Sequence, residues 1–183
     1  FFADHEGDLG EKVRAGRREF LRQFPSLAIP EWDARLADPR DPRCPIRMQC
    51  VPHADEGRPT PGDLVDPLGE VEHTVAPNLV RRYPDRALLL VTDRCSVYCR
   101  FCTRSRMVGQ EHGSTSMDAL EPAMSWLAAN PEVREVIVSG GDPLVAATSR
   151  IEAVLRRLRA IPSIEHVRIA TRAHLDAPAI RRE

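Results

Sequence analysis

The sequence predicts an α/β fold in which short buried strands alternate with amphipathic helices. Three strand-like apolar runs cover residues 87–92, 133–139 and 166–171. Two segments with apolar residues at helical spacing, residues 116–130 and the stretch that begins at Ser149, separate these runs. This alternation is typical of a parallel sheet with right-handed crossover connections. Periodicity does not distinguish an open sheet from an arc of a barrel.

Each element of this alternation has its own signal. The run Ala87–Thr92 is almost entirely aliphatic, as expected of a strand buried on both faces. Pro122 falls near the start of the first helix, where it delays or bends that helix. The second strand is centred on Val136–Val138 and ends at Gly140-Gly141. The second helix begins with the capping-box pattern Ser149-Arg150-Ile151-Glu152.

The chain before residue 85 has a different composition. We expect an amphipathic helix over Glu11–Phe24, followed by the stretch Pro25–Pro84, which is rich in Pro and Asp. Proline fixes φ and removes a backbone donor, so we expect no long regular element in this stretch. Apolar residues along it favour an arm that packs on another surface. We therefore divide the chain into a helix and Pro-rich arm, residues 1–84, and an α/β part, residues 85–183.

Composition and charge exclude several classes of protein. The 183 residues carry 26 Lys and Arg against 27 Asp and Glu, and 42% of them are hydrophobic. This balance is typical of a globular chain and provides no global field for nucleic acid or acidic lipid. No apolar run approaches the ~20 residues of a membrane helix, and the first residues lack the pattern of a signal peptide. We expect a cytoplasmic protein with neither nucleic acid nor membrane as partner.

Three of the five cysteines form the motif C-x3-C-x2-C directly after the first predicted strand, at Cys95, Cys99 and Cys102. In parallel α/β folds, active sites are built at this end of the strands. Three thiolates can hold one soft metal centre, and structural zinc usually takes four protein ligands. An iron–sulfur cluster with one open iron fits better, while zinc stays the alternative. We interpret Cys44 and Cys50 as bystanders.

The residues around these cysteines resemble a known family. The motif with Phe101 before its last cysteine resembles the signature of radical S-adenosylmethionine (SAM) enzymes. Five further runs are similar to the lysine 2,3-aminomutase family: Asp41–Arg47, Arg82–Arg86, Val91–Asp93, Cys95–Arg104 and Ser139–Asp142. The similarity extends from about Asp41 to the end of the chain. It implies the first three βα units of a partial (β/α)6 TIM-like barrel.

The resemblance implies a [4Fe-4S] cluster on the three motif cysteines, SAM and pyridoxal 5′-phosphate (PLP). Reductive cleavage of SAM would start the migration of an amino group between adjacent carbons of a free amino acid joined to PLP. An external flavodoxin- or ferredoxin-type donor would supply the electron, and we expect a homo-oligomer at full length. The alternatives are a radical SAM enzyme that does not use PLP and a non-catalytic cysteine-based metal-binding module.

The resemblance also implies roles for individual residues. SAM is expected at Phe101, Ser139, Gly140, Gly141, Asp142 and Arg172. Within this set, the Asp142 carboxylate would accept a hydrogen bond from the methionine ammonium. PLP is expected at Arg82, Tyr83 and Arg86. Arg86 would pair with the phosphate, assisted by Arg82, because a planar guanidinium suits phosphate oxygens, and Tyr83 would pack on the cofactor.

Substrate recognition is expected at Arg104, which would bind the α-carboxylate of an amino acid. Phe101 stands where we expect a histidine in the lysine enzyme. Arg104 would recognise the carboxylate of any α-amino acid, so lysine, glutamate, arginine or another amino acid all remain possible substrates. PLP enzymes first hold the cofactor on a lysine, and Lys12, outside the family's core, is the only lysine in the sequence. We therefore expect the N-terminal part of such an enzyme, with the PLP lysine downstream and no catalytic residue here beyond the cluster ligands.

Overall fold

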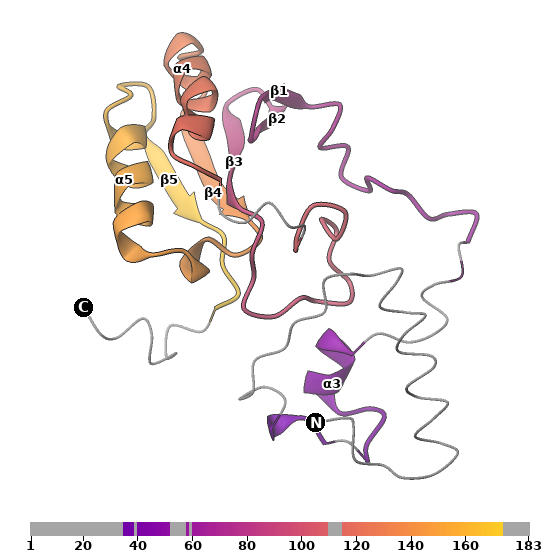
Figure 1. The fold of residues 1–183 in the computed structure, drawn as a ribbon. Coiled ribbons are helices and arrows are strands. Elements are labelled where there is room, and N and C mark those ends of the chain that lie inside the picture. The colour runs from indigo at the N-terminus through magenta and orange to yellow at the C-terminus, as the bar shows by residue number, and fades with distance from the viewer. Residues whose placement is uncertain (1–34, 39, 52–57, 59, 110–114, 174–183) are drawn as a thin grey trace. The chain divides into compact units, whose positions relative to one another are not determined.

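A five-stranded mixed sheet is the main element of the structure (Figure 1). The computed structural model describes residues 35–38, 40–51, 58, 60–109 and 115–173, so the helix expected over Glu11–Phe24 lies outside the described residues. The strands are paired in chain order: β1 (Thr74–Ala76), β2 (Leu79–Tyr83), β3 (Arg86–Thr92), β4 (Glu135–Gly140) and β5 (His166–Ile169). β3, β4 and β5 are parallel, which confirms the α/β class, whereas β1, β2 and β3 pair antiparallel.

The antiparallel pair was not predicted, and it lies inside the stretch assigned to the Pro-rich arm. Two tight turns produce it. Pro77 and Asn78 connect β1 to β2, and Asn78 adopts a positive φ of 64°, which asparagine tolerates better than most residues. Pro84 and Asp85 connect β2 to β3, with Tyr83 opposite Arg86. The sheet therefore begins at Thr74, ahead of the expected boundary at residue 85.

The hydrophobic core lies on one face of the sheet. From β3 it takes Ala87, Leu89 and Val91, and from β4 Val136 and Val138. Two helices, α4 (Glu121–Ala129) and α5 (Thr148–Arg159), pack their apolar sides onto this same cluster. On the other face, Leu88 and Ile137 are only half-buried, so β3 is not equally buried on both faces as predicted. The helices thus cover one face of the sheet and hold β3 and β4, whose carboxyl ends carry the candidate site, in place.

The helices differ in detail from the sequence prediction. Pro122 occupies the first turn of α4, where a missing N–H costs little, and a 3-10 turn over Asp118–Leu120 precedes it. The predicted capping box is wrong, because α5 begins at Thr148 and Ala147 is its N-cap without any side-chain bond. The Ala147 carbonyl instead accepts the first amide bonds of the helix. No helix among the described residues is long and apolar enough to cross a membrane.

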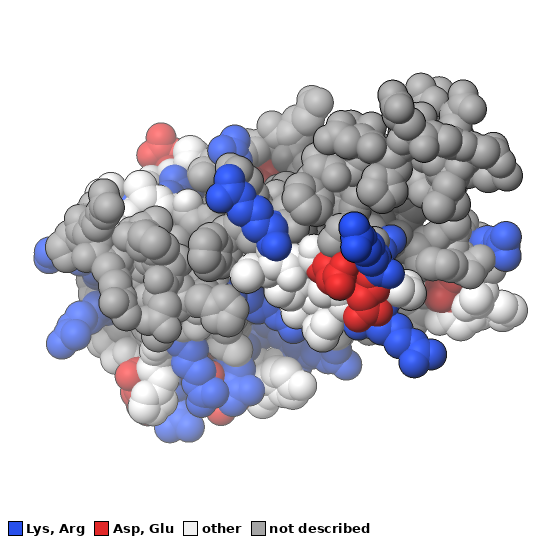
Figure 2. Space-filling view, turned by 90° about the horizontal axis from the view of Figure 1, so that it is seen from below, with Lys and Arg blue, Asp and Glu red and all other residues white. Residues whose placement is uncertain are grey.

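Two compact units divide the chain, and the boundary falls inside the cysteine motif. The sheet belongs to the unit of residues 68–95 and 111–183; the other unit comprises residues 1–67 and 96–110 and contains the short helix α3 (Pro45–Cys50). On the face shown in Figure 2, the described residues present both basic and acidic side chains, and the basic ones cover more of it.

Candidate functional site

The loop after β4 packs directly against the backbone that follows β3. The Gly141 amide donates to the Thr92 carbonyl at 2.7 Å, and the Asp142 amide donates to the Arg94 carbonyl at 2.7 Å. A Cβ on Gly140 would lie 2.1 Å from the Thr92 carbonyl oxygen, and one on Gly141 would lie 2.2 Å from the Arg94 carbonyl oxygen. Gly140 also has a φ of +127°. The two glycines are therefore required by the close approach of two backbone segments at the carboxyl ends of β3 and β4.

Asp142 follows these glycines and is buried, with 5% of its surface exposed. Its Oδ1 accepts hydrogen bonds from the Leu144 amide at 3.0 Å and from the Thr171 hydroxyl at 2.7 Å. Its Oδ2 accepts from the amides of Arg172 at 2.7 Å and Ala173 at 2.9 Å. One carboxylate thus links the loop after β4 to the segment after β5.

Five of the six residues that the resemblance assigns to SAM lie together at these strand ends. They are Ser139, Gly140, Gly141, Asp142 and Arg172. Ser139 is the penultimate residue of β4 and is buried. The sixth, Phe101, belongs to the other unit. The SAM role of these residues stays a prediction. The structure adds that five of them lie in one hydrogen-bonded region at the carboxyl ends of the parallel strands.

Asp93 is a further candidate residue at these strand ends that was not singled out from the sequence. Both of its carboxylate oxygens are buried, and neither has a hydrogen-bond partner in the described part of the chain. A buried carboxylate without a donor is costly, and a donor on a bound ligand would remove that cost. Asp93 stands between Thr92 and Arg94, the two residues whose carbonyls accept hydrogen bonds from the loop at Gly140–Asp142, which we call the glycine loop. A carboxylate two residues before Cys95 is the signal that could have revealed it.

The three cysteines of the motif carry thiols that are not joined in disulfides, and all three are partly exposed. Cys95 follows β3 in the sheet unit, whereas Cys99 and Cys102 lie in the other unit, where the Cys102 amide donates to the Cys99 carbonyl at 3.1 Å. Within the described ranges, no three Cys, His, Asp or Glu side chains are gathered into a metal site. The donor set nevertheless fits an iron–sulfur cluster, because three soft thiolates on one short loop leave one iron open.

The other two cysteines are used in local packing around α3. Both are buried. The Cys50 thiol donates to the Ile46 carbonyl at 2.9 Å, and the Asp38 amide donates to the Cys44 sulfur at 3.3 Å. The backbone N–H groups of Arg47 and Asp38 lower the pKa of the Cys44 thiol below its ordinary value. These contacts give both residues a structural use in the unit that contains Cys99 and Cys102.

A shallow groove beside α3 includes the exposed ring of Phe101. Its other lining residues are Pro45, Met48, Gln49 and Arg100. The Arg100 amide donates to the Gln49 carbonyl at 2.8 Å, and the Arg100 guanidinium donates to the Met48 carbonyl at 3.2 Å. These bonds hold the segment next to the ring against α3. An exposed aromatic ring beside a methionine offers a surface on which a flat heterocycle can stack.

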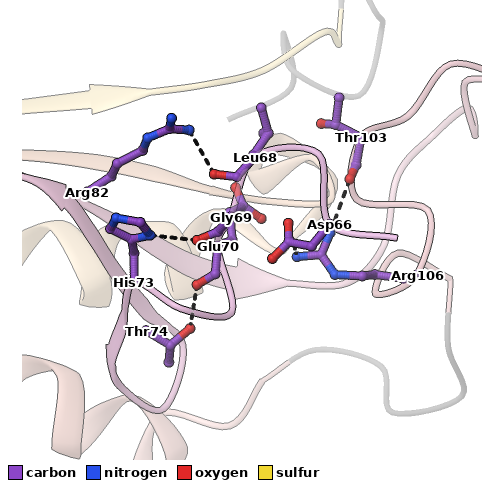
Figure 3. Close-up of polar contacts among 9 residues, drawn as sticks. All are labelled: Asp66, Leu68, Gly69, Glu70, His73, Thr74, Arg82, Thr103 and Arg106. Atoms are coloured by element: carbon purple, nitrogen blue, oxygen red, sulfur yellow. Dashed lines mark hydrogen bonds and ion pairs between the residues drawn. The ribbon is translucent and has the colours of Figure 1, made fainter. Parts of the chain in front are cut away.

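Arg104, the predicted carboxylate ligand, lies in the same loop and is partly buried. Its carbonyl accepts bonds from the amides of Met107 and Val108, which closes the loop into a turn. The neighbouring Arg106 is engaged elsewhere: its guanidinium lies 2.9 Å from Asp66 and donates to the Thr103 carbonyl at 3.2 Å (Figure 3). The role of Arg104 as ligand of the substrate carboxylate stays a prediction.

The residues predicted to bind PLP lie at the opposite end of β3. Tyr83 and Arg86 flank the turn between β2 and β3, and the Arg86 guanidinium lies over the Tyr83 ring, 5.7 Å from its centre. The Arg82 guanidinium donates to the Leu68 carbonyl at 2.8 Å (Figure 3). A seven-residue strand spans about 20 Å. The structure thus separates these three residues from the glycine loop by the length of β3, and their PLP role stays a prediction.

Arg86 also takes part in an ion-pair cluster across three neighbouring strands. Its Nε lies 3.0 Å from Glu135 Oε2, and the Arg168 Nε lies 2.9 Å from Glu135 Oε1. These contacts are close ion pairs without the alignment of hydrogen bonds. Glu135 is 8% exposed and balances two guanidinium groups, so it ties the amino ends of β3 and β4 to the third residue of β5.

Replacing Glu135 by glutamine is expected to lower the free energy of unfolding by about 1–2 kcal/mol, because two guanidinium groups lose their counter-charge. The exposure of Arg86 and Arg168 keeps the effect below that of a fully buried pair. Urea unfolding followed by circular dichroism measures it. Glu132→Gln is the matched control, since Glu132, which lies 3.0 Å from Arg81, is exposed and the loss of this pair should cost about 0.5 kcal/mol or less. Equal losses of unfolding free energy in Glu135→Gln and Glu132→Gln would contradict the assignment of Glu135 as the counter-charge of two guanidinium groups.

Comparison with known proteins places this arrangement in a family. The profile of the Radical SAM superfamily matches residues 89–182, which include the cysteine motif, the glycine loop and the segment after β5. The chain belongs to the radical SAM superfamily. Radical SAM proteins use a [4Fe-4S] cluster and SAM, which confirms these two cofactor predictions and disfavours the zinc alternative for the radical SAM motif of this chain.

Similar curated proteins are aminomutases. L-lysine 2,3-aminomutases of Fusobacterium nucleatum and Bacillus subtilis are each 43% identical over 171 residues, 93% of this chain and 40% and 36% of their own lengths. Glutamate 2,3-aminomutase of Clostridioides difficile is 36% identical over 170 residues, 93% of this chain and 40% of its own length. The radical SAM chain described here thus spans about two fifths of the length of these relatives.

Proposed function

We propose that this chain supplies the cluster-binding and SAM-binding part of a PLP-dependent amino acid 2,3-aminomutase of the radical SAM superfamily. The observation that carries the proposal is the packing of Gly140 and Gly141 on the backbone of Thr92 and Arg94. This packing fixes the glycine loop at the base of the segment that leads into the cysteine motif. The 36–43% identity to lysine and glutamate 2,3-aminomutases supports the reaction class.

The proposal includes the barrel architecture. β3, β4 and β5 are parallel and adjacent in chain order, with α4 and α5 between them. Both helices pack on the same face of the sheet, as helices do on the outside of a barrel. This arrangement supports the first three βα units of a partial (β/α)6 TIM-like barrel.

The cofactors and this chain have separate tasks. When bound, the cluster and SAM supply a strongly reducing electron and a 5′-deoxyadenosyl radical, and PLP supplies a conjugated ring that carries the amino group. Cys95, Cys99 and Cys102 would hold three irons. The loop at Gly140 and Gly141 would present its backbone to the methionine part of SAM. A flavodoxin- or ferredoxin-type donor would supply the electron, and we propose a homo-oligomer.

Substrate recognition by this chain would be limited to the part that all α-amino acids share. Arg104 is suited to this task, because its guanidinium can bind a carboxylate through two parallel hydrogen bonds. One relative is named for lysine and another for glutamate, and these two amino acids differ only in their side chains. A free amino acid is therefore the proposed substrate class, without a choice between the two.

Anaerobic reconstitution of the protein that carries this chain, at its natural length, tests the function. We expect a brown iron–sulfur protein whose reduced spin-resonance signal changes on adding SAM and which releases 5′-deoxyadenosine under reduction. With PLP and an α-amino acid, it should form the β-amino isomer. A colourless zinc protein without a SAM response would indicate a metal-binding module. SAM cleavage without any binding of PLP would indicate a different radical SAM reaction.

A further inference from the structure

The Asp142 carboxylate has no acceptor position left for another donor. A carboxylate offers about four lone-pair sites, and four donors occupy those of Asp142 at 2.7–3.0 Å. Three of these donors are backbone amides, and the fourth is the Thr171 hydroxyl. The side chain is also buried, with 5% of its surface exposed. A methionine ammonium could reach Asp142 only by displacing one of these internal bonds.

The four donors come from two separate places in the chain. Leu144 belongs to the 3-10 turn Pro143–Val145 that directly follows, for which Asp142 is the N-cap. The other three, Thr171, Arg172 and Ala173, stand about 30 residues downstream, after β5. The backbone amide of Asp142 meanwhile donates to the Arg94 carbonyl after β3. One residue therefore joins the segments that leave three adjacent parallel strands.

The segment after β5 depends on this carboxylate. β5 pairs with β4 on one side, and all four of its residues are exposed. Beyond the strand, the Ala170 amide still donates to the Val138 carbonyl at 2.9 Å, and the next anchors that the structure describes are the bonds to Asp142. Charge-assisted bonds to a buried carboxylate are stronger than neutral ones. The backbone of Arg172, a predicted SAM residue, is thus fixed by Asp142.

We propose that Asp142 is a positioning residue of the SAM site, which acts through the segment that it holds and makes no hydrogen bond to the methionine ammonium. The proposal deepens the function proposed above and rests on it for the identity of the ligand. Asp142 keeps residues 171–173 against the glycine loop, so that the carboxyl ends of β3, β4 and β5 form one surface for SAM.

Asp142→Asn tests the proposal in the SAM-free protein. Asparagine has one acceptor oxygen where aspartate has two and carries no charge, so the Arg172 and Ala173 amides lose their charged acceptor. We expect their hydrogen exchange to become at least tenfold faster. Asp118→Asn, at an exposed aspartate in the 3-10 turn before α4, is the control and should leave these rates unchanged. Unchanged exchange at Arg172 and Ala173 in Asp142→Asn would overturn the proposal, whether or not the protein is an aminomutase.

Binding of SAM and of an analogue that lacks the α-amino group gives the second measurement. A positioning residue affects both ligands alike, so Asp142→Asn should weaken both by the same factor. If Asp142 bound the ammonium, the substitution would weaken SAM and leave the analogue unaffected, which would overturn the proposal. Thr171→Val keeps the carboxylate and removes one of its donors. We expect it to weaken both ligands equally as well, which covers the case in which Asp142→Asn does not fold.

Discussion

Replacing Gly140 by alanine is expected to lower the free energy of unfolding by about 3 kcal/mol or more. The new methyl group would lie 2.1 Å from the Thr92 carbonyl oxygen, a distance at which the backbone has to move. The φ of +127° adds strain, because L side chains rarely adopt that conformation. A loss of this size is a large fraction of the 5–15 kcal/mol that typically stabilises a domain. Urea unfolding followed by circular dichroism measures it.

Gly62→Ala is the matched control. Nothing lies within 4 Å of the position that its Cβ would take, and Gly62 is absent from the glycines with positive φ among the described residues. Alanine there should leave stability unchanged or raise it by about 0.5 kcal/mol, since it restricts the unfolded chain. If Gly140→Ala and Gly62→Ala had equal stabilities, the close approach between the strand ends would not exist in solution.

Replacing any one of Cys95, Cys99 or Cys102 by alanine is expected to abolish cluster loading. A cluster bound by three protein thiolates has no spare ligand in the motif, so removal of one leaves two irons open. We expect the release of 5′-deoxyadenosine to fall by about 100-fold or more, beyond the usual cost of losing a residue that only supports a ligand. Iron content, the absorption of the reconstituted protein and product analysis measure the loss together.

Cys50→Ser is the control for these substitutions. The serine hydroxyl can replace the thiol as the donor to the Ile46 carbonyl, so α3 keeps its contact. Cluster loading and SAM cleavage should then equal those of the unsubstituted protein. A loss of iron in Cys50→Ser as large as that in Cys99→Ala would show that the ligand set is not the three cysteines of the motif.

The sequence predicts the parallel part of the fold because its signals are local. The apolar run at Ala87–Thr92 and the short run around Val136–Val138 each contain enough buried side chains to specify a strand within a few residues. The helix near Pro122 and the strand at His166 were likewise found close to their observed bounds. The cysteine motif needs only spacing for its recognition, so it too can be read directly from the chain.

The remaining features depend on contacts between residues that are distant in sequence. β1 and β2 are too short for a periodic signal, and only the dipeptides at Pro77 and Pro84 indicate their turns. The donors to Asp142 come from a segment about 30 residues away, and Glu135 meets Arg86 only because β3 and β4 are neighbours. Such pairings require the strand order, which periodicity does not contain.

The strand order also has a consequence for biosynthesis. Every strand of the sheet pairs with the strand made just before it, from β1 to β5. A chain that emerges from the ribosome can therefore add each strand to an edge that already exists, without waiting for a later segment to be inserted between finished strands. The hairpin of β2 and β3 would serve as the template, and the order of synthesis would set the register of each strand that is added to it.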